Sequence, residues 1–288
     1  MYFYARQPIP ALAGWIDKLW ICEDYLPSHR LEQKLPDAAL AWIINLKEDR
    51  FRLFEGNRFD RSIHLPGSII AGPRSTYFYL ETESQESCLG IQFKPGGARP
   101  FLGDLIGELK DVDIALRDGL GRHAHVDDLR ERLLETSSAE RRLQLVERYL
   151  QRRLEKPIRT PAGHPAVAYA LRMFERAPAA APSVAQIADM ANLSKERFIR
   201  VFKGEVGLTP KNYGNIVRFR LALRMIREGR LPPGIDLALS CGYYDQSHLN
   251  REFRKYANRT PTELLRRQDR FESHLPLTEL PSGNKRAD

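Results

Sequence analysis

Apolar and polar positions repeat with two different periods along this chain of 288 residues. In its first third, short apolar runs are separated by polar turns, and Phe51 and Leu53 alternate with arginines at a period of two, which is typical of a half-buried strand. The pattern predicts strands at residues 15–22, 40–46, 51–53, 68–71, 76–80 and 89–93. Closely spaced strands joined by polar turns favour a small β-sandwich or barrel.

A helical period replaces the strand period after residue 93. Helices are expected at residues 100–105, 127–134 and 138–154, and the last of these has Ser137 and Glu140 at capping-box spacing. Its apolar stripe needs a partner, and packing against the strands is favoured over pairing with the same helix of a second subunit. The stripe consists of Leu143, Val146, Leu150 and Leu154.

Two glycines lie in the turn KPGGAR at residues 94–99, between the last strand and the first helix. The turn lacks the G-x-x-x-x-G-K-[ST] spacing of a phosphate-binding loop, so a plain strand-to-helix turn is the favoured interpretation. The alternative is that its backbone amides and Arg99 line a pocket for an anionic effector.

A proline-containing segment, residues 156–164, is expected to be a linker, and an amphipathic helix begins near Val167. These features divide the chain into residues 1–155, a β-rich domain with a helical end, and residues 165–268, an all-α domain. Residues 269–288 are expected to be a flexible tail. The fold class is therefore α+β, with two domains.

Helix start signals occur in quick succession at the beginning of the all-α domain. Ser183 and Gln186 form a capping box, Asn192 lies at a turn that needs a left-handed residue, and Ser194 caps the segment SKERFIRVFK. Phe198, Val201 and Phe202 give this segment an apolar face, and its other face is largely charged. A helix, a short turn and a second helix form a helix-turn-helix unit.

The unit occurs twice. Seven positions recur 51 residues later with similar chemistry, namely Phe198/Leu249, Arg200/Arg251, Phe202/Phe253, Lys203/Arg254, Gly207/Asn258, Thr209/Thr260 and Pro210/Pro261. Glycine and asparagine can both end a helix with positive φ, and Thr-Pro then begins another helix. Residues 210–228 between the copies are predicted to form one long, rigid helix. Two units on such a helix can place two helices in successive major grooves of DNA, roughly 34 Å apart.

Charge is divided unevenly along the chain. Residues 164–288 contain 21 Lys and Arg against 13 Asp and Glu, whereas residues 1–163 contain 24 of each, so the whole net charge of +8 lies in the C-terminal part. A neutral half joined to a basic half is typical of a nucleic-acid-binding domain attached to another kind of domain. No apolar run is long enough to span a bilayer and the N-terminus does not resemble a signal peptide, so we expect a cytoplasmic protein.

No catalytic pattern emerges from the histidines, cysteines and carboxylates. Cys22, Cys88 and Cys241 are far apart in sequence and are expected to be buried free thiols, and the histidines lack partners at metal-ligand spacing. We therefore expect no enzyme activity, no metal and no cofactor. A metal-dependent β-barrel enzyme fused to a DNA-binding domain is a disfavoured alternative.

The repeated residues resemble the twin helix-turn-helix domain of the AraC/XylS family of bacterial transcription regulators. The resemblance covers about residues 165–267 and rests on Ile187-Ala188, Ser194, Phe198, Arg200, Phe202-Lys203, Gly207, Thr209-Pro210, Tyr213, Arg218, Leu237-Ala238, Gly242-Tyr243, Ser247, Leu249, Arg251, Phe253 and Thr260-Pro261. The strand-rich front with its KPGGA turn is similar to an uncharacterised sensor-type domain that precedes this domain in some members.

The resemblance implies DNA contacts by Lys195, Glu196, Ile199, Arg200 and Lys203 in the first unit, and by Gln246, Ser247, Asn250, Arg251 and Arg254 in the second. Arg200 and Arg251 are candidates for guanine, Gln246 or Asn250 for adenine, and the others include phosphate contacts. The implied partners are double-stranded promoter DNA, a small-molecule effector at the front domain, RNA polymerase and a second subunit. A ligand-independent regulator with a structural front domain is the alternative, and for each arginine the alternative is an ion pair within the domain.

Two features of the second unit depart from the family pattern. Gly234, after two prolines, stands where an apolar residue is expected, so its first helix should begin late. Gly214 lies inside the long helix and should weaken it by about 1 kcal/mol relative to alanine. Both features predict weaker DNA binding by the second unit.

Overall fold

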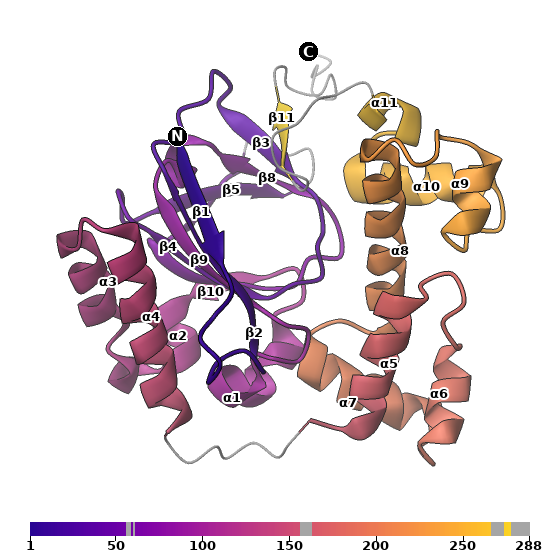
Figure 1. Cartoon of the computed structure of the whole chain (residues 1–288), viewed down its shortest axis with the longest axis horizontal. Helices are drawn as coiled ribbons and strands as arrows, with labels where there is room; N and C mark the ends of the chain where they lie inside the picture. The colour runs from indigo at the N-terminus through magenta and orange to yellow at the C-terminus, as the bar shows by residue number, and fades with distance from the viewer. Residues whose placement is uncertain (56–58, 60, 156–162, 266–273, 278–288) are drawn as a thin grey trace.

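The computed structural model describes residues 1–55, 59, 61–155, 163–265 and 274–277, and within these it confirms the α+β class with a β-rich front and a helical C-terminal domain (Figure 1). Two antiparallel sheets make up the front domain. The first has the order β1 (Tyr2–Arg6), β2 (Ile16–Glu23), β9 (Cys88–Phe93), β4 (Ala41–Asn45), β7 (Ser68–Ala71) and β10 (Asp113–Ala115). The second has the order β11 (His274–Leu277), β3 (Leu31–Lys34), β8 (Phe78–Glu81), β5 (Phe51–Glu55) and β6 (Ile63–Leu65).

All six predicted strands are present, and those of the first sheet match the predicted apolar runs closely. The structure adds β1, β3, β6, β10 and β11, which the sequence pattern did not predict. Of these, β11 corrects the expectation for the tail, because residues 274–277 form a strand of the second sheet instead of a flexible end. Residues 156–162 of the predicted linker lie outside the described residues.

Short helices follow β9 and cover one side of the first sheet (Figure 1). They are α1 (Arg99–Leu102), η2 (Gly103–Glu108), α2 (Leu116–Leu120), η3 (Arg122–Ala124), α3 (Val126–Glu135) and α4 (Ala139–Leu154). Leu143, Val146 and Leu150 of α4 are buried in one core with residues of β2, β4 and β9. The favoured packing of the α4 stripe against the strands is thereby confirmed.

The N-cap of α4 was predicted one residue too early. Ser138, not Ser137, caps the helix by accepting a hydrogen bond from the backbone amide of Arg141. Two adjacent serines offer the same chemistry, and the capping-box spacing from Glu140 selected the wrong one. Glu140 instead lies 3.3 Å from Arg6 of β1.

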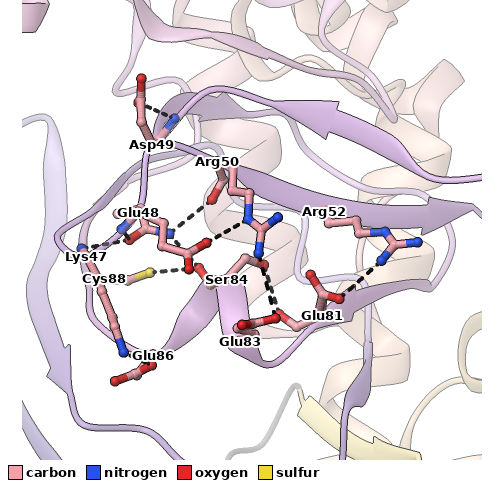
Figure 2. Close-up of polar contacts among 12 residues, drawn as sticks. Lys47, Glu48, Asp49, Arg50, Arg52, Glu81, Glu83, Ser84, Glu86 and Cys88 are labelled. Carbon is pink, nitrogen blue, oxygen red and sulfur yellow. Dashed lines mark hydrogen bonds and ion pairs between the residues drawn. The ribbon is translucent and has the colours of Figure 1, made fainter.

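A polar network ties the β4–β5 turn to the short helix η1 (Glu83–Gln85). Figure 2 shows Lys47 and Arg50 of the turn paired with glutamates, and Arg52 of β5 paired with Glu81 at 3.3 Å. Beneath it, buried Asn45 makes four hydrogen bonds, donating to the carbonyls of Arg50 and Ser84 and accepting from two turn amides. The turn is therefore fixed by contacts of both side chains and backbone.

Seven helices of the described region form the C-terminal domain around one apolar core. They are α5 (Pro165–Arg176), α6 (Val184–Met190), α7 (Lys195–Val206), α8 (Pro210–Arg227), α9 (Ile235–Ser240), α10 (Gln246–Ala257) and α11 (Pro261–Leu265). In Figure 1, α8 runs between the first unit at its lower end and the second unit at its upper end. The predicted long connecting helix is confirmed, and within the described residues no helix is long and apolar enough to cross a membrane.

Gly214 has a packing reason that the sequence did not reveal. A Cβ atom at this position of α8 would lie 3.2 Å from the ring of Phe174, so the glycine allows α5 to pack closely on α8. Glycine therefore lowers the helix propensity of α8 locally, but it makes room for the contact between α5 and α8.

Candidate DNA-binding surface

The first recognition helix, α7, is held by local signals at both ends. Ser194 accepts a hydrogen bond from the amide of Arg197 at 3.2 Å, and Gly207 ends the helix with φ of 83°. Phe198 and Phe202 are fully buried. Their burial fixes the rotation of α7 and leaves Lys195, Glu196 and Arg200 exposed, with Ile199 and Lys203 half-buried.

The second recognition helix, α10, repeats this construction with different residues. Asp245 is the N-cap, accepting from the amide of His248 at 2.6 Å, and Asn258 ends the helix with φ of 54°. Leu249 and Phe253 are fully buried. The predicted DNA-contacting side chains on the other face are exposed or, for one of them, half-buried; they are Gln246, Ser247, Asn250, Arg251 and Arg254.

The two key arginines are not engaged within the domain. Among the residues that the structure describes, neither Arg200 nor Arg251 is ion-paired with a carboxylate, although Glu252 and Asp245 are close to Arg251 in sequence. Both residues are exposed. Their proposed contacts with bases stay predictions.

The helix that precedes α10 begins late, as the sequence predicted. Helix α9 starts at Ile235, and its N-cap Gly234 has no side chain with which to cap it. In the first unit, by contrast, Ser183 and Gln186 form a complete capping box at the start of α6. The second unit is therefore the less well capped of the two.

A groove of about 460 Å³ lies beside α7 in the first unit. Its lining consists of Ser183, Val184, Ala185, Lys195, Ile199, Thr209, Pro210 and Lys211. The first turns of α6 and α8 border it, and both of its lysines are exposed. Sequence reasoning missed Lys211, although its position directly after the Thr209-Pro210 helix start was a usable signal.

The front domain contacts the C-terminal end of each recognition helix. Arg99 of α1 forms an ion pair with buried Glu205 of α7, whose carboxylate also accepts from the backbone amide of His164 at 2.8 Å. Arg99 is thus part of a domain contact, and the anionic effector pocket that was the alternative for the KPGGAR turn stays a prediction.

At the other unit, Gln33 of β3 donates to the carbonyl of Ala257 at 2.9 Å and accepts from Arg259. Ala257 is the last residue of α10, and Glu205 likewise lies in the last turn of α7. Leu35 and Ala38 of the front domain also lie in the C-terminal core. The two domains are consequently packed together near both helix-turn-helix units.

The described residues contain no group of three or more His, Cys, Asp or Glu side chains placed to hold a metal ion. All three cysteines are buried, and none of them forms a disulfide. Burial raises the pKa of the Cys241 thiol to about 11 and that of Cys88 further, which disfavours a reactive thiolate in either.

Comparison with known proteins identifies both regions of the chain. A helix-turn-helix domain model matches residues 187–267, which contain both recognition helices and α8. The C-terminal domain is an AraC-type helix-turn-helix domain. The front matches a domain of unknown function, DUF6597, over residues 4–115. The uncharacterised front domain is thus confirmed, and its sensing role stays a prediction.

Curated relatives of the AraC-type domain include two bacterial regulators. The probable transcriptional regulator LumQ of Photobacterium leiognathi is 35% identical over 80 residues, which are 28% of this chain and 32% of LumQ. The HTH-type transcriptional activator RhaS of Escherichia coli is 32% identical over 85 residues, 30% of each protein. This chain thus matches about a third of the length of these relatives.

Two solved structures extend the comparison. An AraC-type regulator from Chromobacterium violaceum is 24% identical and covers 35% of this chain and 89% of its own, with a TM-score of 0.32. ToxT from Vibrio cholerae is 13% identical and covers 91% of this chain and 96% of its own, with a TM-score of 0.44.

Proposed function

We propose that this protein is a sequence-specific transcription regulator that binds promoter DNA through α7 and α10 in two successive major grooves. The observation that carries the proposal is the repeated pair of capped helices with exposed basic faces, joined by the single helix α8. Arg200 and Arg251 are at equivalent positions of the two units and present guanidinium groups that can bond the O6 and N7 atoms of guanine. Gln246 or Asn250 supplies an amide for adenine.

Contacts with the DNA backbone set the position of the domain. Lys195, Lys203 and Arg254 are assigned to phosphates, and the groove between α6 and α8 adds Lys211 to this set. Because neutralised phosphates release counterions, binding should weaken steeply as the salt concentration rises.

Control by a small molecule at the front domain is the second part of the proposal. The contacts of Arg99 with Glu205 and of Gln33 with Ala257 support it, since a ligand that shifts the front domain would change how both recognition helices are held. A functional regulator would also meet RNA polymerase. A second subunit would have to use a surface other than the α4 stripe, which is buried against the sheet.

The decisive experiment selects DNA fragments retained by the full protein and then measures Arg200→Ala on the selected site and on random DNA. The variant should lose about 1 to 3 kcal/mol of binding free energy on the selected site only, with relaxed sequence preference in one half-site. Arg172→Ala is a matched control, because this exposed arginine lies on α5 outside both units. An equal loss on both DNAs would make Arg200 a phosphate contact.

Effector control is tested by a thermal-shift screen of metabolites on the full protein. A ligand that binds the folded state raises Tm, and the stabilisation grows with the logarithm of its concentration once this exceeds Kd. A Tm that no compound of a broad set changes would instead favour the ligand-independent regulator.

A further inference from the structure

The chain returns to the front domain after it has completed the AraC-type domain. Strand β11 pairs antiparallel with β3, so that His274 faces Lys34 and Leu277 faces Leu31 across the pair. In Figure 1, β11 is the yellow strand beside β3, although the neighbouring yellow helices belong to the C-terminal domain. A segment of four residues thus joins the end of the DNA-binding domain to the edge of the second sheet.

One face of β11 is apolar and contributes to both domains. Leu275 is fully buried and lies in the core of the C-terminal domain, whereas Leu277 packs with Phe54 and Tyr79 of the second sheet. Leu275 is also the partner of Gln33, the residue that holds the end of α10. Pairing of β11 therefore orders the position from which the front domain contacts the second unit.

The other face of β11 carries His274, whose two ring nitrogens are both engaged. Nδ1 lies 2.8 Å from a carboxylate oxygen of Glu32, and Nε2 lies 3.1 Å from Nζ of Lys34. A lysine ammonium can only donate, so Nε2 must accept and Nδ1–H must donate to Glu32. The geometry thus requires a neutral imidazole.

We propose that residues His274–Leu277 are a pH-sensitive latch that holds the AraC-type domain against the front domain, and that protonation of His274 opens it. A proton on Nε2 would face the Lys34 ammonium at hydrogen-bond distance. Nε2 could then no longer accept the hydrogen bond from Lys34. The released strand, in contrast, would accept the proton in water without such repulsion.

Charges of both signs surround His274: burial and Lys34 lower its pKa, Glu32 and Asp37 raise it, and the net shift is downward. Lys34 lies 3.6 Å from Asp37, while Lys18 of β2 and Arg220 of α8 add positive charge near Lys34. Glu32 is also contacted by Tyr25 and His29. Burial raises the pKa of Glu32, but hydrogen bonds from His274, Tyr25 and His29 outweigh it and lower the pKa to about 2. Glu32 therefore stays ionised over the range in which histidine titrates.

The direction of the pH effect follows from the two states of His274. Burial and the Lys34 ammonium lower the pKa of His274 in the latched state, below the value of about 6.5 for a free histidine. The released state then binds more protons, so the latch is complete above about pH 6.5 and weakens as the pH falls below it. Because the released state binds one more proton, the equilibrium between the latched and released states changes by at most about tenfold per pH unit.

The test is hydrogen exchange of the full protein at about pH 7.5 and about pH 5.5, with each rate divided by its intrinsic rate. The amides of His274, Leu275 and Leu277 should lose roughly tenfold of their protection at the lower pH, and Pro276 has no amide hydrogen to report. His274→Gln, whose neutral amide can replace both hydrogen bonds, should show equal protection at both values. His29→Gln is the matched control and should behave as the unmodified protein does, since His29 contacts Glu32 from outside the latch.

Protection that does not change with pH in the unmodified protein, or a pH effect that persists in His274→Gln, would overturn the proposal. If the glutamine variant fails to form β11, nitrogen NMR of the unmodified protein decides: a neutral His274 with its proton on Nδ1 and a pKa below about 6.5 supports the latch, and a pKa at or above that value overturns it. The effect on promoter binding rests on the proposed function. The exchange measurement needs no DNA, so failure of the latch and failure of DNA binding are separate outcomes.

Discussion

Replacing Gly207 with alanine should destabilise the protein through two separate effects, and Gly229 provides the means to separate them. Both glycines end a helix with positive φ, 83° at Gly207 and 66° at Gly229. An alanine in this conformation costs about 1 to 2 kcal/mol. A Cβ at Gly229 meets nothing within 4 Å, whereas one at Gly207 would lie 2.7 Å from Cγ of Pro73 and 3.1 Å from the carbonyl of Ile106.

Pro73 and Ile106 belong to the front domain, and neither a proline ring nor a backbone carbonyl yields easily. Overpacking of this kind adds about 1 to 3 kcal/mol. Urea denaturation should therefore show a loss of about 1 to 2 kcal/mol for Gly229→Ala and about 2 to 5 kcal/mol for Gly207→Ala. Adding Pro73→Ala to Gly207→Ala should restore part of the stability that Gly207→Ala loses beyond the loss of Gly229→Ala. Equal losses for the two glycine variants would refute the contact between α7 and the front domain.

Two further predictions concern the interior of the front domain. Asn45→Ala removes the four hydrogen bonds of a buried side chain and should cost about 2 to 4 kcal/mol in urea denaturation. Arg50→Ala, which removes only exposed ion pairs of the same turn, should change stability little. Glu147→Ala breaks the pairing of a buried carboxylate with Arg6 at 2.8 Å and should cost about 2 to 4 kcal/mol. Its control is Glu140→Ala, whose half-exposed side chain should contribute less than about 1 kcal/mol; similar losses in the two glutamate variants would show that burial does not matter here.

Local signals in the sequence predicted the helix ends of the DNA-binding domain because these ends are decided by near neighbours. Ser183, Ser194 and Thr209 cap helices as expected, each accepting from an amide three residues later. Asn192 and Asn258 both have positive φ, as their places at turns required. The repeat was visible for the same reason, since the two units use the same local chemistry at one spacing.

Contacts between distant segments had no comparable signal. Gln33 and Ala257 are 224 residues apart, and nothing in the four residues of β3 indicates which helix end they meet. Strand β11 is as short, contains a proline and follows a charged segment, so its apolar alternation was too brief to distinguish it from a tail. The ten predicted DNA-contacting residues are accessible on α7 and α10, and their individual roles stay predictions.

The place at which the front domain holds each recognition helix has a consequence for regulation. Glu205 and Gly207 lie at the C-terminal end of α7, and the matching end of α10 is held at Ala257. Lys195, Glu196 and Gln246 lie at the opposite, N-terminal ends, which enter the major groove in helix-turn-helix complexes. The front domain can therefore change the tilt of both helices, or release the second through β11, without covering the residues assigned to DNA. Regulation by such contacts would alter the fit to two half-sites together, and would act on half-site spacing more strongly than on the bases preferred within either one.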